Sequence, residues 1–80
     1  MKETFTRNLT TALKKIIKGK VHCCIVKDTL VVDIESTHRT GWKYILPNLS
    51  SEIVQGFTSK KCAEIIVKQY TTYIRNLYFL

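Results

Sequence analysis

The chain has 80 residues, with thirteen lysines and arginines against six aspartates and glutamates, for a formal net charge of +7 at pH 7. This length fits one domain with a small core, so we expect a single domain over residues 1–80. An apolar content of 45% excludes wholesale disorder, and no apolar run reaches the roughly 18 residues of a membrane-spanning helix.

The first predicted element is an amphipathic helix from Phe5 to Lys18. Thr4 or Thr6 is expected to cap its start, and Gly19 fits the left-handed position after its last turn. Its basic side also fits a membrane-surface helix, but the following hairpin offers the apolar stripe a better partner. That stripe recurs at three- and four-residue intervals: Phe5, Leu9, Leu13, Ile16 and Ile17.

Two segments rich in β-branched residues, Val21–Val26 and Thr29–Ser36, flank Lys27-Asp28, which we expect to form a tight hairpin turn. Side chains alternate between the two faces of a strand. One face is wholly apolar and is expected to meet the helices: Val21, Cys23, Ile25, Leu30, Val32 and Ile34. The other face is mixed and is expected to be partly wet: His22, Cys24, Val26, Val31, Asp33 and Glu35.

Residues 42–46 predict a third strand that Pro47 ends. Residues 49–55 predict a short helix with Asn48 or Ser50 as its cap, and Thr58 or Ser59 caps a long C-terminal helix. The core stripe of this last helix is Ala63, Ile66, Val67, Tyr70, Ile74, Leu77 and Tyr78.

The predicted fold class is therefore α+β. A two- or three-stranded antiparallel sheet has two main helices packed on one face, with a short helix before the last one. The residues expected to point inward are Leu9, Leu13, Ile16, Val21, Cys23, Ile25, Leu30, Val32, Ile34, Ile66, Val67, Tyr70 and Ile74.

Apolar residues of the C-terminal helix extend beyond one stripe. Cys62, Ile65, Tyr73 and the tail 77–80 place apolar groups on more than one side. A helix with two apolar sides has to bury both, and in so small a domain a second copy is one available partner. We therefore expect self-association.

The sequence offers neither a catalytic nor a metal site. His22, Cys23 and Cys24 are neighbours, but adjacent strand residues point to opposite faces, and no ligand pair has the spacing of a known zinc site. Cys24 beside His22 lacks an orienting carboxylate, and so short a chain leaves little room for a substrate pocket. We expect no enzymatic activity, no cofactor and no small-molecule substrate.

The cysteine pattern also bears on the compartment. Three cysteines without a C-x-x-C pair argue against a secreted disulfide scaffold. The N-terminus is polar and basic with no apolar run behind it, unlike a signal peptide. We therefore expect a cytoplasmic protein.

Nucleic-acid binding is a second hypothesis, because a basic surface attracts polyanions. The candidate phosphate-binding residues are Lys14, Lys15, Lys18, Lys20, Arg39, Lys60 and Lys61. Trp42 and Tyr44 could add stacking contacts, although they fit the core equally well. The solvent-exposed face of a helix is, however, commonly rich in lysine whether or not it binds an anion.

The order of helix, strands and helix resembles the double-stranded RNA-binding domain. In that family the second helix opens with a Ser-Lys-Lys-x-Ala-Lys type of run that contacts phosphates. Here Ser59-Lys60-Lys61-Cys62-Ala63 is similar, with Gly56 just upstream. The sequence departs from the family at Glu64, which replaces the third lysine, and in the extra helix at 49–55.

Most of the chain is also similar in style to small uncharacterised phage and prophage proteins of Gram-positive bacteria. The segments that carry this resemblance are residues 18–21, 27–32, 54–57 and 69–70. It implies an intracellular accessory role and brings no catalytic residue.

From all these features we expect a non-enzymatic, small basic interaction module of phage-like origin that self-associates or binds a protein partner. The alternative is a DNA- or RNA-binding accessory or regulatory protein with a lysine patch.

Overall fold

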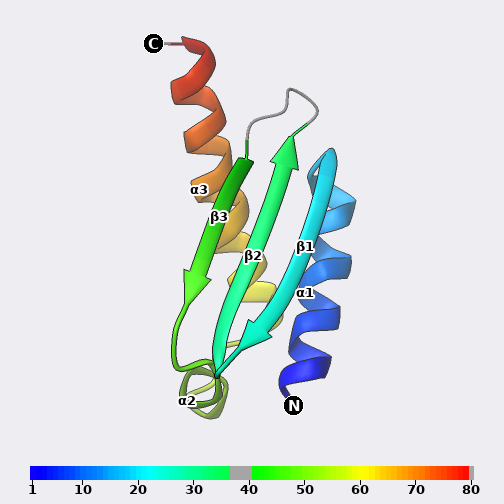
Figure 1. Cartoon of the computed structure of the whole chain (residues 1–80), viewed down its shortest axis with the longest axis vertical. Coiled ribbons are helices and arrows are strands. Elements are labelled where there is room, and N and C mark those ends of the chain that lie inside the picture. Colours follow the sequence, from blue (N-terminus) through cyan, green and yellow to red (C-terminus); the bar gives the residue numbers. More distant parts are fainter. Residues whose placement is uncertain (37–40, 80) are drawn as a thin grey trace.

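The computed structural model describes residues 1–36 and 41–79 and confirms the predicted α+β architecture, third strand included. The elements are α1 (Lys2–Ile16), β1 (Gly19–Val26), β2 (Thr29–Ser36), β3 (Gly41–Leu46), α2 (Leu49–Val54) and α3 (Ser59–Phe79). The strands form one antiparallel sheet in the order β1-β2-β3. Both long helices lie on the same side of this sheet and run in the same direction (Figure 1).

The strand register confirms which face of the hairpin is buried. Cys23 pairs with Val32 and Ile25 with Leu30, so the apolar side chains of β1 and β2 share the face that meets the helices. Strand β3 adds Trp42, Tyr44 and Leu46 to this face, opposite Ile34, Val32 and Leu30 respectively. The residues buried between the helices and the sheet include Leu9, Leu13, Leu30, Val32, Ile34 and Ile66.

The end of α1 differs from the sequence-based prediction. The helix ends at Ile16, and Ile17 adopts an extended backbone with φ −96° and ψ 125°. This change of direction turns the Ile17 side chain into the core at 7% exposure, whereas Ile16 remains 60% exposed. The prediction that Ile16 points inward was therefore wrong, because the two isoleucines exchange roles where helix becomes strand.

The start of α1 also lacks the predicted threonine cap. The helix begins at Lys2, and its N-cap residue Met1 makes no side-chain capping hydrogen bond. The Thr6 hydroxyl instead donates to the Lys2 carbonyl oxygen at 2.8 Å, within the helix. Thr6 therefore bonds back along α1 rather than capping its start, as Thr10 and Thr11 also bond back along the helix.

The last turns of α3 extend beyond the ends of the strands (Figure 1). Leu77 and Tyr78, which continue the helical spacing of the core stripe, are 47% and 49% exposed. Their predicted place in the core was wrong because the 21-residue helix outruns the sheet that would cover them.

The turn between β1 and β2 joins the hairpin to α2. Lys27 and Asp28 both have positive φ, 49° and 62°, as a tight two-residue hairpin turn requires. The Asp28 carboxylate accepts hydrogen bonds from Ser50, whereas Asn48, the N-cap residue of α2, makes no side-chain capping bond. The predicted cap from Asn48 or Ser50 is thus replaced by a residue of the hairpin.

At the start of α3 the predicted cap is present, since Thr58 Oγ1 accepts a hydrogen bond from the Lys61 N–H at 3.2 Å.

Candidate functional site

The open face of the sheet, which no helix covers, is sorted into rows by the strand register. One row across the three strands holds His22, Asp33 and Lys43, and the Lys43 ammonium lies 3.6 Å from the Asp33 carboxylate. The next row is apolar and holds Cys24, Val31 and Ile45. This face therefore has a charged half, whose charges compensate one another, and an apolar half.

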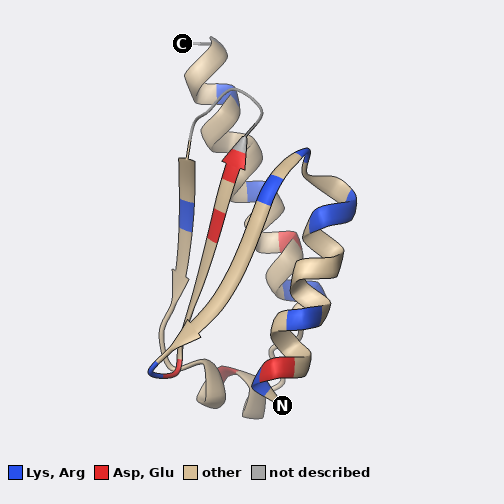
Figure 2. Ribbon diagram, turned by 45° about the vertical axis from the view of Figure 1, so that its right-hand side comes forward, with Lys and Arg blue, Asp and Glu red and all other residues tan. Residues whose placement is uncertain are grey.

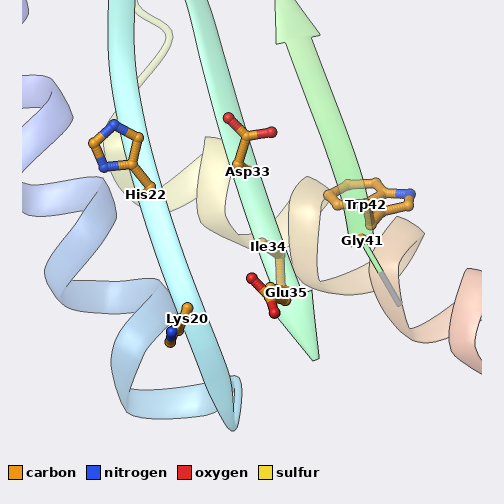
Figure 3. Close-up of a pocket in the computed structure, with 7 residues that line it drawn as sticks. All are labelled: Lys20, His22, Asp33, Ile34, Glu35, Gly41 and Trp42. Carbon is orange, nitrogen blue, oxygen red and sulfur yellow. The ribbon is translucent and has the colours of Figure 1, made fainter. Parts of the chain in front are cut away.

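A shallow hollow of about 470 Å³ lies at the charged end of the sheet. Its polar lining comes from Lys20 and His22 of β1 and from Asp33 and Glu35 of β2. Figure 3 shows these side chains standing apart along the two strands rather than closing around a common point. Within residues 1–36 and 41–79, no group of three His, Cys, Asp or Glu side chains is arranged to hold a metal ion.

The three thiols lie in different environments. Cys62 of α3 is fully buried, and this burial raises its pKa to about 12. Partial burial also raises the pKa of Cys23, against an opposing effect of its contact with Thr10. Neither thiol has the depressed pKa of a reactive cysteine, so both behave as small apolar groups.

The aromatic side chains of β3 belong to the core side of the sheet. Trp42 lies edge-on to Tyr70 of α3, with ring centroids 5.7 Å apart, and stacks on Tyr44 at 6.2 Å. Burial raises the pKa of Tyr44. Both rings are therefore in contact with other side chains of the protein. These contacts favour a core role for Trp42 and Tyr44 over stacking on nucleic-acid bases.

Positive charge is concentrated in the helix layer, by which we mean α1 and α3. Each of these helices contains four basic residues and one acidic residue, whereas the three strands together contain two of each. Six of the seven net positive charges therefore belong to the two long helices. Figure 2 shows basic segments along both helices and acidic segments on β2, with further acidic segments at the start of α1 and on α3.

The structure distributes the predicted phosphate-binding residues over several surfaces. Lys14 is on the side of α1 near Cys23 of β1, and Lys20 lies on the open face of the sheet. Lys60 lines a groove between the long helices, whereas Lys61 lines a separate hollow with Glu52 and Phe57. The exposed residues Lys15 and Lys18 lie at and just after the end of α1, and Arg39 lies outside the described residues.

The groove between α1 and α3 is the most apolar hollow among those found on the described part of the chain. It measures about 510 Å³. Ala12 and Ile16 line it from α1, and Ala63 and Val67 line it from α3. Lys60, Glu64 and Lys68 border it on the α3 side. It therefore combines an apolar floor with a largely basic border.

Sequence reasoning missed this groove. Ile16 and Val67 repeat with the same spacing as the buried residues, so periodicity assigned both to the core. The partial exposure of these two side chains depends on the distance between α1 and α3. The periodicity of apolar residues in the sequence carries no information about that distance.

Comparisons with known proteins yield no relative from which a function can be transferred: no family model matches the chain, and no curated protein or solved structure is significantly similar to it. Within the described residues, no helix combines the length and the hydrophobicity needed to cross a membrane.

Proposed function

We propose that the chain is a non-enzymatic interaction module of phage-like origin, which binds an anionic protein partner through its helix layer. The observation that carries this proposal is the separation of charge between the two layers of the fold. The helices α1 and α3 hold six of the seven net positive charges, and the sheet is neutral. The phage-like origin is supported by the resemblance of residues 18–21, 27–32, 54–57 and 69–70 to small phage and prophage proteins.

The character of the sheet supports binding rather than catalysis. Asp33 is paired with Lys43, and the hollow beside them is shallow and mixed in charge. The thiols of Cys23, which is partly buried, and Cys62, which is buried, have raised pKa values, which disfavours the thiolate needed for nucleophilic attack. A basic helical surface, in contrast, attracts anionic partners over about a Debye length and accelerates their association.

Poly-L-glutamate provides a generic anionic probe for this proposal. We expect the full chain to bind fluorescein-labelled poly-L-glutamate at low salt, with an affinity that falls as salt is added. Lys14→Gln/Lys15→Gln, in the helix layer, is expected to weaken binding several-fold. Lys20→Gln/Lys43→Gln removes the same charge from the sheet and is the matched control. Equal weakening by both variants would contradict a binding surface on the helices.

Self-association is the second part of the proposal, and exposed apolar side chains of α3 support it. Ile65, Leu77 and Tyr78 are 38%, 47% and 49% exposed. Exposed apolar residues on one helix favour burial against another copy. Sedimentation velocity at micromolar concentration should give a dimer for the wild type and a monomer for Leu77→Ser. A wild-type monomer at all accessible concentrations would remove this part of the proposal.

A nucleic acid is the second candidate partner, and the first turn of α3 favours it. This turn contains Lys60 and Lys61 and no acidic residue. Lysines at a helix N-terminus oppose the positive end of the helix dipole, so their presence there is more easily understood if an anion binds. The resemblance of residues 59–63 to the phosphate-contacting run of the double-stranded RNA-binding domain supports the same candidate.

A gel-shift titration on duplex DNA, duplex RNA and single strands distinguishes the two candidates. A nucleic-acid binder should retard one of these probes, with an affinity that falls steeply with salt and weakens in Lys60→Ala/Lys61→Ala. An interaction module that binds a protein should retard none of them at moderate salt.

A further inference from the structure

The groove between α1 and α3 has a floor of small and branched apolar side chains. Ala63 is only 5% exposed, and the Ile16 side chain at the end of the groove is 60% exposed. Alanines at the floor allow another element to approach the two helices closely. Ile16 and Val67 then offer apolar surface that this element would remove from water.

The border of the groove is largely basic on the α3 side, and helical spacing places a further lysine near it on α1. Lys60 and Lys68 line it from α3 and flank Glu64 at four-residue spacing, so the single acidic residue has a lysine one turn away in each direction. Lys15 is exposed and follows Ala12 by three residues, which places it on the same side of α1. An occupant with acidic flanks would therefore be complementary in charge.

We propose that this groove binds an amphipathic acidic helix of a protein partner. This inference rests on the proposed function and specifies the partner of the same helix layer. The apolar stripe of the partner helix lies on Ala12, Ile16, Ala63 and Val67, and its acidic residues face the lysines of the border.

The dimensions of the groove fit a helix. On α3 it extends from Ser59 to Lys68, nine residue steps that cover about 14 Å along the helix axis. Three apolar side chains spaced i, i+4 and i+7 on a partner helix cover about 11 Å. The two long helices run side by side in one direction, so a third helix can follow the line between them (Figure 1).

The apolar floor favours a protein over a nucleic acid. A duplex is held through its phosphates, and it gains nothing from contact with Ile16 and Val67. An amphipathic helix uses the floor and the border at once, so apolar burial adds to charge attraction.

Three fluorescein-labelled probes test the proposal by fluorescence anisotropy with the full chain. The first is a peptide of about 16 residues with leucines at i, i+4, i+7 and i+11 and glutamates between them, about 24 Å long as a helix. The second has the same composition with the leucines scattered around the helix. The third is a short DNA duplex.

We expect the amphipathic peptide to bind at least about tenfold more tightly than the scattered one. Lys60→Glu/Lys68→Glu, at the groove, should weaken its binding by about tenfold. Lys61→Glu/Arg75→Glu makes the same charge change on the same helix outside the groove and should cost about twofold. Ile16→Ser removes an exposed side chain that the fold does not need, and it should cost about fivefold.

Equal binding of the two peptides would overturn the groove proposal and leave the basic helix layer as the binding surface. Equal weakening by the two double variants would overturn it in the same way. If the duplex bound more tightly than the amphipathic peptide, the partner would be a nucleic acid and the groove would not be its site. Failure of all three probes to bind at low salt would overturn the proposed function itself.

Discussion

The carboxylate of Asp28 accepts two hydrogen bonds from Ser50, one from its hydroxyl at 2.6 Å and one from its backbone N–H at 3.0 Å. Asp28 lies in the turn between β1 and β2, and Ser50 lies in the first turn of α2, 22 residues further along the chain. A residue of the hairpin turn therefore caps a helix that is distant in sequence. The ammonium group of Lys2 lies 3.4 Å from the same carboxylate. One side chain thus joins the hairpin, α2 and the start of α1.

The energetic coupling between Asp28 and Ser50 gives the first prediction. Asp28→Asn replaces the charged acceptor by a neutral amide oxygen, and Ser50→Ala removes the hydroxyl donor. Each change should lower the urea midpoint of unfolding, followed by the fluorescence of the single tryptophan, Trp42. Because both changes act on the same hydroxyl–carboxylate hydrogen bond, the double variant should lose less than the sum of the two single losses. Additive losses would show that the hydrogen bond from the Ser50 hydroxyl to Asp28 contributes nothing to stability.

The pH dependence of stability gives the second prediction. The hydrogen bonds from Ser50, assisted by the charge of Lys2, lower the pKa of Asp28 below its ordinary value. The unfolded chain therefore takes up this proton more readily, so the stabilisation is complete above about pH 4 and is lost as pH falls through the lower folded-state pKa. The urea midpoint of the wild type should fall in this acidic range, and that of Asp28→Asn should fall less. Identical acid profiles would contradict the assignment.

The short helix α2 supplies a matched pair of residues for the third prediction. Leu49 is fully buried, whereas Val54 in the same helix is 76% exposed. Leu49→Ala leaves a cavity and should destabilise the fold by about 2–4 kcal/mol in urea unfolding. Val54→Ala should change stability by less than about 0.5 kcal/mol. Similar effects of the two changes would mean that α2 is not anchored through Leu49.

The thiols should react in an order set by the fold. Cys24 is on the open face of the sheet, Cys23 faces α1 with a raised pKa, and Cys62 is buried with a pKa of about 12. In the native protein at mildly alkaline pH, a thiol-specific reagent should modify Cys24 first, Cys23 more slowly and Cys62 only after unfolding. Cys24→Ser should abolish the fast phase. Native modification of Cys62 at the rate of Cys24 would contradict this burial.

The strand part of the fold was predictable because its information is local. Alternation in the hairpin sorted Cys23, Ile25 and Val32 onto the inner face, and the register confirms this sorting. The third strand and the cap of α3 by Thr58 also follow from short sequence patterns. Each of these features depends on residues close in the sequence.

The remaining features depend on contacts between distant residues. Helical spacing cannot tell that Ile17 rather than Ile16 turns inward, because the exchange arises from the extended backbone that leads into β1. The cap of α2 comes from Asp28, far upstream, and no local motif encodes it. The candidate lysines share a charge but not a surface, since Lys20 lies on the sheet and Lys60 beside the groove.

The central claim is that the helix layer, and not the open sheet face, is the binding surface of this protein. It is tested most directly by a titration of the ¹⁵N-labelled full chain with poly-L-glutamate, followed residue by residue through its amide resonances. We predict that the shifts concentrate in α1 and α3 and disappear as salt is raised. Shifts concentrated in β1 to β3, or the absence of any shift at low salt, would contradict the account.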